Sequence, residues 1–169
     1  MDTTDLLVDA FQRVRDAVHP AVQGLTPEQL STRLEGQANS IAWLVWHLAR
    51  VQDHHVADAA GTQQVWTADG WEKRFGLPFD PDATGYGHGP EDVSAVKVES
   101  GELLTGYFEA VHEATLRFVG SLNPEDLDRV VDTRWDPPVT LGVRLVSVID
   151  DDLEHVGQAA FVRGLLQGS

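Results

Sequence analysis

Apolar residues recur at helical spacing in four long stretches of the sequence, and this pattern limits the fold more than any other feature. The stretches cover about residues 2–19, 40–60, 100–120 and 141–166. Each stretch has one apolar stripe, so each predicted helix has one face to bury against the others. The sequence therefore predicts an all-α fold, an up-down-down-up four-helix bundle with a long irregular crossover between the second and third helices.

Capping residues mark where these helices begin. The second helix is expected to start after Asn39 or Ser40, and the fourth after Thr140. The segments 24–30 and 121–127 each contain a capping residue followed by proline, directly after a long helix. We interpret this echo as a quasi-duplicated pair of units, each made of a long helix, a capped turn, a loop and a second long helix.

The segment 61–100 between the second and third helices is rich in turn-forming residues. Its aromatic residues argue against disorder, and residues 69–75 are expected to form one or two helical turns. A connection this long inside one domain serves either as a lid or pocket wall or as a packed crossover of the bundle. The sequence favours neither alternative.

Length and charge restrict the class of protein. A chain of 169 residues predicts one domain with one site. The formal charge of −15 argues against nucleic acid or an anionic membrane as a partner. The sequence contains no apolar run of roughly 18 residues and no basic start typical of a signal peptide, so a cytoplasmic location is expected.

Cysteine is absent from the sequence. The chain therefore has no disulfide, no thiolate nucleophile and no sulfur ligand for a metal. Any thiol chemistry needs a thiol from solution, and any metal site must use the seven His residues and the carboxylates.

Asp151 and His155 form the strongest chemical pattern in the sequence. Four residues apart on a helix, they share one face with Cβ atoms about 5–6 Å apart, close enough to bind one metal ion. With Asp152 they fall in the inward sector of their helix, where a carboxylate is costly unless it is paired or bound to metal. The alternative is a charged edge formed by residues 150–152 with Arg144 as partner.

His47 is the candidate third ligand, because it lies at the inward edge of the apolar stripe of the second helix. His54 lies roughly 10 Å further along by helical rise, too far to share a metal with His47. We interpret His54 and His55 as solvated or hydrogen-bonded side chains and His112 as structural.

Two motifs resemble a known family. Residues 39–50, Asn-Ser-Ile-Ala-Trp-Leu-Val-Trp-His-Leu-Ala-Arg, resemble the second-helix motif of the DinB-like metalloprotein superfamily, and residues 155–158, His-Val-Gly-Gln, are similar to its last-helix motif. The resemblance covers nearly the whole chain and implies a single DinB-like bundle over residues 1–169. Members commonly hold a metal with one His from the second helix and two His, four residues apart, from the last. Here the first of that pair is Asp151, and in the mycothiol-dependent maleylpyruvate isomerase branch this position is Glu.

The resemblance implies a metal-dependent thiol S-transferase, which conjugates a low-molecular-weight thiol to a small electrophile. Members of the branch that contains thiol transferases use mycothiol or bacillithiol, and the tryptophan-rich link resembles that of actinobacterial members, which favours mycothiol. The expected metal ligands are His47, Asp151 and His155. Gln158 is expected to orient a ligand or substrate, and Arg163 is a candidate substrate anchor. Two imidazoles and one carboxylate with an open position suit a catalytic zinc ion, with nickel as the alternative metal. A cation there would deprotonate a coordinating thiol at neutral pH.

Two other functions remain open. A hydrolase of the same fold would use metal-activated water as its nucleophile, and thiol-dependent turnover distinguishes it from a transferase. A non-enzymatic, dimeric metal-binding bundle would keep the site as a relic, and an absent thermal response to added metal would favour it. Related proteins are often homodimers, so a homodimer is one expected assembly.

Overall fold

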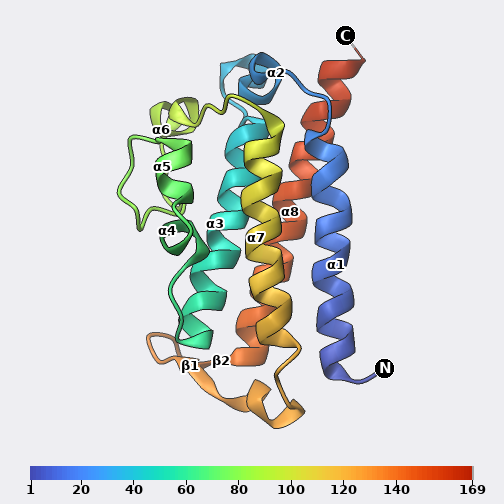
Figure 1. The fold of residues 1–169 in the computed structure, drawn as a ribbon, viewed down its shortest axis with the longest axis vertical. Helices are drawn as coiled ribbons and strands as arrows, with labels where there is room; N and C mark the ends of the chain where they lie inside the picture. The colour runs from blue at the N-terminus through green and yellow to red at the C-terminus, as the bar shows by residue number, and fades with distance from the viewer. Residues whose placement is uncertain (169) are drawn as a thin grey trace.

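The computed structural model describes residues 1–168, which contain four helices of 19 to 27 residues. They are α1 (Thr3–Val22), α3 (Ile41–Ala60), α7 (Gly101–Val119) and α8 (Leu141–Gln167). Figure 1 shows α1 and α8 running in one direction and α3 and α7 in the other. The predicted all-α bundle is confirmed, and its order is up, down, down, up.

Each helix of the bundle packs on two neighbours. α1 and α3 both lie against α7 and α8, so α1 and α3 occupy diagonal positions. Within residues 1–168 the core forms a larger cluster around Trp46 and Phe108 and a smaller one around Phe11 and Leu145. None of the helices in this part of the chain is long and apolar enough to cross a membrane.

Local hydrogen bonds explain most helix boundaries. Ser40 accepts the Trp43 N–H at 3.1 Å, and Gly61 ends α3 in the left-handed conformation, with φ 66°. The sequence predicted a start after Asn39 or Ser40 and an end near residue 60. The first helix extends three residues beyond its predicted end near residue 19, because α1 continues through Pro20 to Val22. Pro20 is exposed to water and lies in the last turn, so the helix tolerates its missing N–H.

The two predicted capped turns are present. α2 (Pro27–Ser31) begins with a capping box between Thr26 and Gln29, and the 3₁₀ turn η2 (Pro124–Asp128) begins with one between Asn123 and Asp126. Each turn follows a long helix, as the echo in the sequence indicates. A further 3₁₀ turn, η1 (Leu34–Gly36), precedes α3.

The link between α3 and α7 is ordered and packed. It contains α4 (Val65–Ala68), α5 (Trp71–Phe75) and α6 (Pro90–Ala95), which lie along the outer side of α3 in Figure 1. The predicted helical turn at residues 69–75 corresponds to α5. Buried side chains anchor the link to the core, including Trp66, Phe75, Val93 and Val96. The link is therefore a packed crossover, and part of it also contacts the site described below.

A small antiparallel hairpin, β1 (Val130–Asp132) and β2 (Val139–Thr140), closes the end of the bundle near the start of α8. Its Asp132 pairs with Arg134 at 2.8 Å and with Arg144 at 2.9 Å. Hydrogen bonds from Arg134, aided by Arg144, hold the pKa of Asp132 below its usual range. Arg144 therefore pairs with the hairpin and not with residues 150–152, which corrects the alternative of a charged edge there.

His55 meets the same arginine, since Arg144 Nη1 donates to His55 Nδ1 at 3.3 Å. Burial, with Arg144 as the next cause, lowers the pKa of His55 to about 4. The folded protein keeps His55 neutral, whereas the unfolded chain takes up a proton below about pH 6.5. The contribution of His55 to the free energy of unfolding is therefore fully present above pH 6.5 and is lost as the pH falls towards 4.

We expect His55→Gln to flatten the acid side of the stability profile. Between pH 6.5 and 4 the free energy of unfolding of the wild type should fall by about 2 kcal/mol more than that of the variant. Urea denaturation at a series of pH values measures this difference. Parallel profiles for the two proteins would show that His55 is not kept neutral by the fold.

Candidate metal centre

His47 from α3 and Asp151 and His155 from α8 come together on the seam between these antiparallel helices. One potential ligand atom from each residue lies within 4.8 Å of the others. His47 is buried, whereas the His155 and Asp151 side chains keep 16% and 31% of their surface exposed. The structure thus gathers the three residues that the sequence singles out, in a place that a small molecule can reach from solution.

Both histidines are held in the same tautomer by backbone carbonyl groups. His47 Nδ1 lies 2.5 Å from the Thr84 carbonyl oxygen, and His155 Nδ1 lies 2.7 Å from that of Asp151. A carbonyl oxygen only accepts, so each Nδ1 carries the proton and donates it. In the neutral rings the lone pair is then on Nε2, and both Nε2 atoms are free to bind a cation.

The charge states of the cluster suit a divalent cation. Burial lowers the pKa of His47 to about 4, with His155 and His88 adding to the effect and the Thr84 carbonyl opposing it. Burial also raises the pKa of Asp151, while His155 opposes the shift. Asp151 Oδ2 is buried and accepts no hydrogen bond within residues 1–168. This oxygen lies 3.4 Å from His155 Nδ1. A carboxylate oxygen without a hydrogen bond, in a cluster with two imidazole rings, fits a metal ion, because the ion supplies the missing partner.

Trp43 forms an aromatic wall beside the cluster. Its ring stacks on His47 with centroids 4.5 Å apart and an interplanar angle of 14°, and it lies 6.2 Å from the His155 ring. Trp43 Nε1–H donates to His88 Nδ1 at 3.2 Å, so neutral His88 carries its own proton on Nε2. Trp43 was not predicted as a site residue, although its position four residues before His47 places it on the same helical face.

Residues 81–85 of the link, which we call the strap, run beside α3, and Thr84 and Gly85 lie directly against His47. Gly85 has φ 97°, and a Cβ atom at this position would lie 2.6 Å from His47 Nδ1 and 3.1 Å from the Trp46 ring. Only glycine allows the backbone to come this close. The link therefore also forms a wall of the candidate site, which was the other alternative left open by the sequence.

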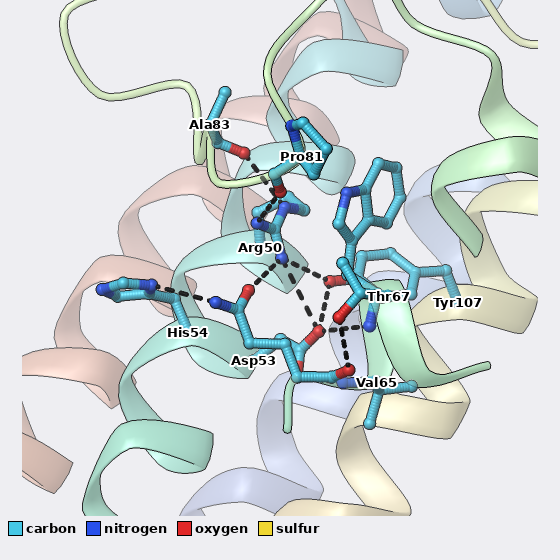
Figure 2. Close-up of polar contacts among 10 residues, drawn as sticks. Arg50, Asp53, His54, Val65, Thr67, Pro81, Ala83 and Tyr107 are labelled. Carbon is cyan, nitrogen blue, oxygen red and sulfur yellow. Dashed lines mark hydrogen bonds and ion pairs between the residues drawn. The ribbon is translucent and has the colours of Figure 1, made fainter. Parts of the chain in front are cut away.

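Arg50 fixes the strap to α3 one turn after His47. Its guanidinium is fully buried and donates to the carbonyl oxygens of Ala83 at 3.1 Å and Pro81 at 3.0 Å. Figure 2 shows Arg50 between these two carbonyl groups on one side and Asp53 and Tyr107 on the other. Because Ala83 immediately precedes Thr84, Arg50 also holds the carbonyl group that orients His47.

Asp53 balances the buried charge of Arg50 and caps α4. Its Oδ1 accepts the Val65 N–H, and its Oδ2 accepts the Trp66 N–H and the Tyr107 hydroxyl, each at 2.8 Å (Figure 2). Oδ2 also lies 3.6 Å from Arg50 Nη1. Burial raises the pKa of Asp53, and these donors together with Arg50 oppose the shift. The network of Arg50, Asp53 and Tyr107 thus joins α3, α7 and the link.

We expect Gly85→Ala to weaken metal binding by about 10–100-fold. Losses of this size are typical when the group that hydrogen-bonds the other nitrogen of a ligating histidine is disturbed, and for His47 that group is the Thr84 carbonyl. The added methyl group must push the strap away from His47. Gly87→Ala is the matched control, since Gly87 also has a positive φ, 76°, but no atom lies within 4 Å of its added Cβ. Competition with a chromophoric zinc chelator measures both affinities, and equal affinities would contradict an orienting role for the strap.

The other residues predicted at or near the site lie as follows. Gln158 is exposed one turn after His155 and borders an apolar groove. Arg163 Nη1 donates to the Gln23 carbonyl oxygen at 2.7 Å and ties α8 to the end of α1, which gives no support to a role as substrate anchor. Asp152 is fully buried on the core side of α8, where burial raises its pKa well above the usual value. His112 is buried and stacks on the Phe108 ring.

Comparisons with known proteins agree with this architecture. The sequence model of a family described as Mycothiol-S-transferase matches residues 6–168. A crystal structure of a conserved protein from Enterococcus faecalis is similar to this chain with a TM-score of 0.93 and 31% sequence identity, over 100% of this chain and 99% of that one. A search of curated proteins found no match. The resemblance to the DinB-like superfamily is confirmed, and the chain belongs to the mycothiol S-transferase family.

Proposed function

We propose that this protein is a metal-dependent thiol S-transferase that joins mycothiol to a small electrophile. The observation that carries the proposal is the cluster of His47, Asp151 and His155, with both imidazole Nε2 atoms available and a carboxylate oxygen unsatisfied. The chain has no cysteine, so the sulfur nucleophile must be a second substrate. Membership of the mycothiol S-transferase family supports mycothiol as that substrate.

His47, Asp151 and His155 would hold the cation, and zinc fits two imidazoles and one carboxylate, with nickel as the alternative. When bound, the cation supplies the positive charge that lowers the pKa of a thiol beside it. Trp43 covers one side of the cluster and excludes water there, because its ring lies against both imidazoles. The partly exposed side at Asp151 lets the thiol enter and its proton leave to water.

The reaction breaks two bonds, S–H and the bond from carbon to the leaving group, and forms two, S–C and the O–H bond of the water that takes the proton. The sulfur atom bonds to the electrophilic carbon, the thiol proton goes to water, and the leaving group departs with its electron pair. A hydrolase built on the same cluster would instead transfer the oxygen of water to its substrate. The two proposals therefore differ in whether turnover consumes thiol.

Elemental analysis followed by a turnover assay tests the proposal. We expect about one divalent metal ion per chain, and mass spectrometry should detect a mycothiol conjugate when the loaded protein is incubated with mycothiol and monobromobimane. The rate should exceed the uncatalysed rate and disappear with a chelator. Protein that takes up no metal, or that turns over a hydrolysable ester equally well without thiol, would contradict the proposal.

A homodimer is part of the proposal. The outward face of α8 exposes Val143, Val146 and Leu153, with 45–61% of each residue accessible. Apolar side chains grouped on one exposed helical face support contact with a second copy. Light scattering coupled to gel filtration is expected to give twice the chain mass of 18.5 kDa.

A further inference from the structure

An apolar groove of about 460 Å³ lies between α8 and the segment made of η1, residues 38–39 and the first turn of α3. Its wall includes Leu34, Leu44, Gly157, Phe161 and Val162, and Gln158 and Asn39 are its polar lining residues. No ionisable side chain lines it. The volume falls within the range of sites for small molecules, which is roughly 300–1,000 Å³.

The groove begins about one helical turn from the candidate metal ligands. Leu44 precedes His47 by three residues on α3, and Gln158 follows His155 by three residues on α8. Because the two helices are antiparallel, both steps lead in the same direction along the seam, by about 4.5 Å of helical rise. None of the three candidate ligands lines the groove, so a molecule bound in it reaches the cluster by extending about one helical turn past Leu44 and Gln158.

We propose that this groove binds the apolar part of the electrophile, an assignment that rests on the proposed transferase function. Mycothiol is a sugar-based thiol with many hydroxyl groups, and an apolar wall would leave those groups without hydrogen-bond partners. The other reactant is the one that an apolar wall can bind. The substrate class is thus a small molecule with an alkyl or aryl body and an electrophilic carbon at the end that faces the cluster.

Two glycines on the exposed side of α8 give a matched pair of variants. No atom lies within 4 Å of a Cβ added at Gly157 or at Gly164, so either position accepts a larger side chain without a clash of that atom. Gly157 lines the groove, whereas Gly164 lies two turns further along α8 and does not. Gly157→Leu fills the groove, and Gly164→Leu makes the same change in composition outside it.

The first measurement uses N-phenyl-1-naphthylamine, a neutral apolar fluorophore, with protein free of metal and thiol. We expect the wild type and Gly164→Leu to bind it with similar affinity and Gly157→Leu to bind at least 10-fold more weakly. Equal binding by all three proteins would overturn the assignment. So would a change of oligomeric state confined to Gly157→Leu, because the groove would then be a contact between copies of the chain.

The second measurement uses metal-loaded protein, mycothiol and a series of 1-bromoalkanes of increasing length. We expect kcat/KM to rise about threefold per methylene group in the wild type and in Gly164→Leu, and to be independent of length in Gly157→Leu. Turnover that does not depend on length in any of the proteins would overturn the groove as the electrophile site. Absence of turnover would instead contradict the transferase function, while the fluorophore titration still decides whether the groove binds apolar molecules.

Discussion

His155→Ala is expected to lose stoichiometric metal binding, with a dissociation constant more than about 100-fold higher than that of the wild type. This loss of affinity is larger than the loss of about 10–100-fold expected when only a group that hydrogen-bonds a ligating histidine is disturbed, because the substitution removes one of three metal ligands outright. It also leaves Asp151 partly buried without the imidazole that opposes its raised pKa. Elemental analysis after dialysis, followed by chelator competition, measures the loss.

The control for this prediction is His54→Ala. His54 belongs to the same helix as His47 but lies outside the cluster, where Gln64 Nε2 contacts its Nδ1 at 3.3 Å. This variant should keep one metal ion per chain. If His155→Ala also keeps a full complement of metal, the ion binds elsewhere and the proposed centre is wrong.

Arg50→Met is expected to lower the free energy of unfolding by about 3–5 kcal/mol, the typical cost of removing one partner from a buried ion pair. Arg50 is fully buried, so its loss leaves Asp53 without a cation and leaves the carbonyl groups of Pro81 and Ala83 without a donor. The strap should then loosen, and the metal affinity should fall together with the stability. Urea denaturation of metal-free protein measures the loss of stability separately from the loss of metal affinity.

Two further variants make this prediction specific. Arg13→Met removes an exposed arginine whose ion pair with Asp9 lies on the surface, and it should have little measurable effect. Asp53→Asn in the Arg50→Met background removes the uncompensated charge and should restore part of the lost stability. If Arg50→Met were as stable as the wild type, the network in Figure 2 would not hold the link to α3.

The long helices could be predicted because their signals are local. Ser40 and Gly61 delimit α3 through contacts within a few residues, and such contacts are visible in sequence. The end of α1 was missed because Pro20 looks like a terminator, whereas an exposed last turn tolerates it. The hairpin was missed because strands of 3 and 2 residues are too short to give an alternating pattern.

The candidate site could likewise be predicted from the sequence only in part. The spacing of Asp151 and His155 brings them onto one face of α8, and the inward position of His47 identifies the facing helix. The groups that orient His47 left no such signal. Thr84 acts through its backbone carbonyl, which any residue would supply, and Gly85 looks like an ordinary turn glycine. Arg50 and Asp53, three residues apart, could have been recognised as a pair, but their partners in the link could not.

The position of the cluster on the seam between α3 and α8 has a consequence for the protein as a whole. A metal ion bound there would join two points of the chain separated by about 100 residues, and because the unfolded chain lacks the assembled site, the ion would stabilise the folded state alone. The ion would thus act as a non-covalent counterpart of the disulfides that a chain without cysteine cannot form. Metal supply would then determine how long the protein survives heat and proteolysis, as well as whether it is active.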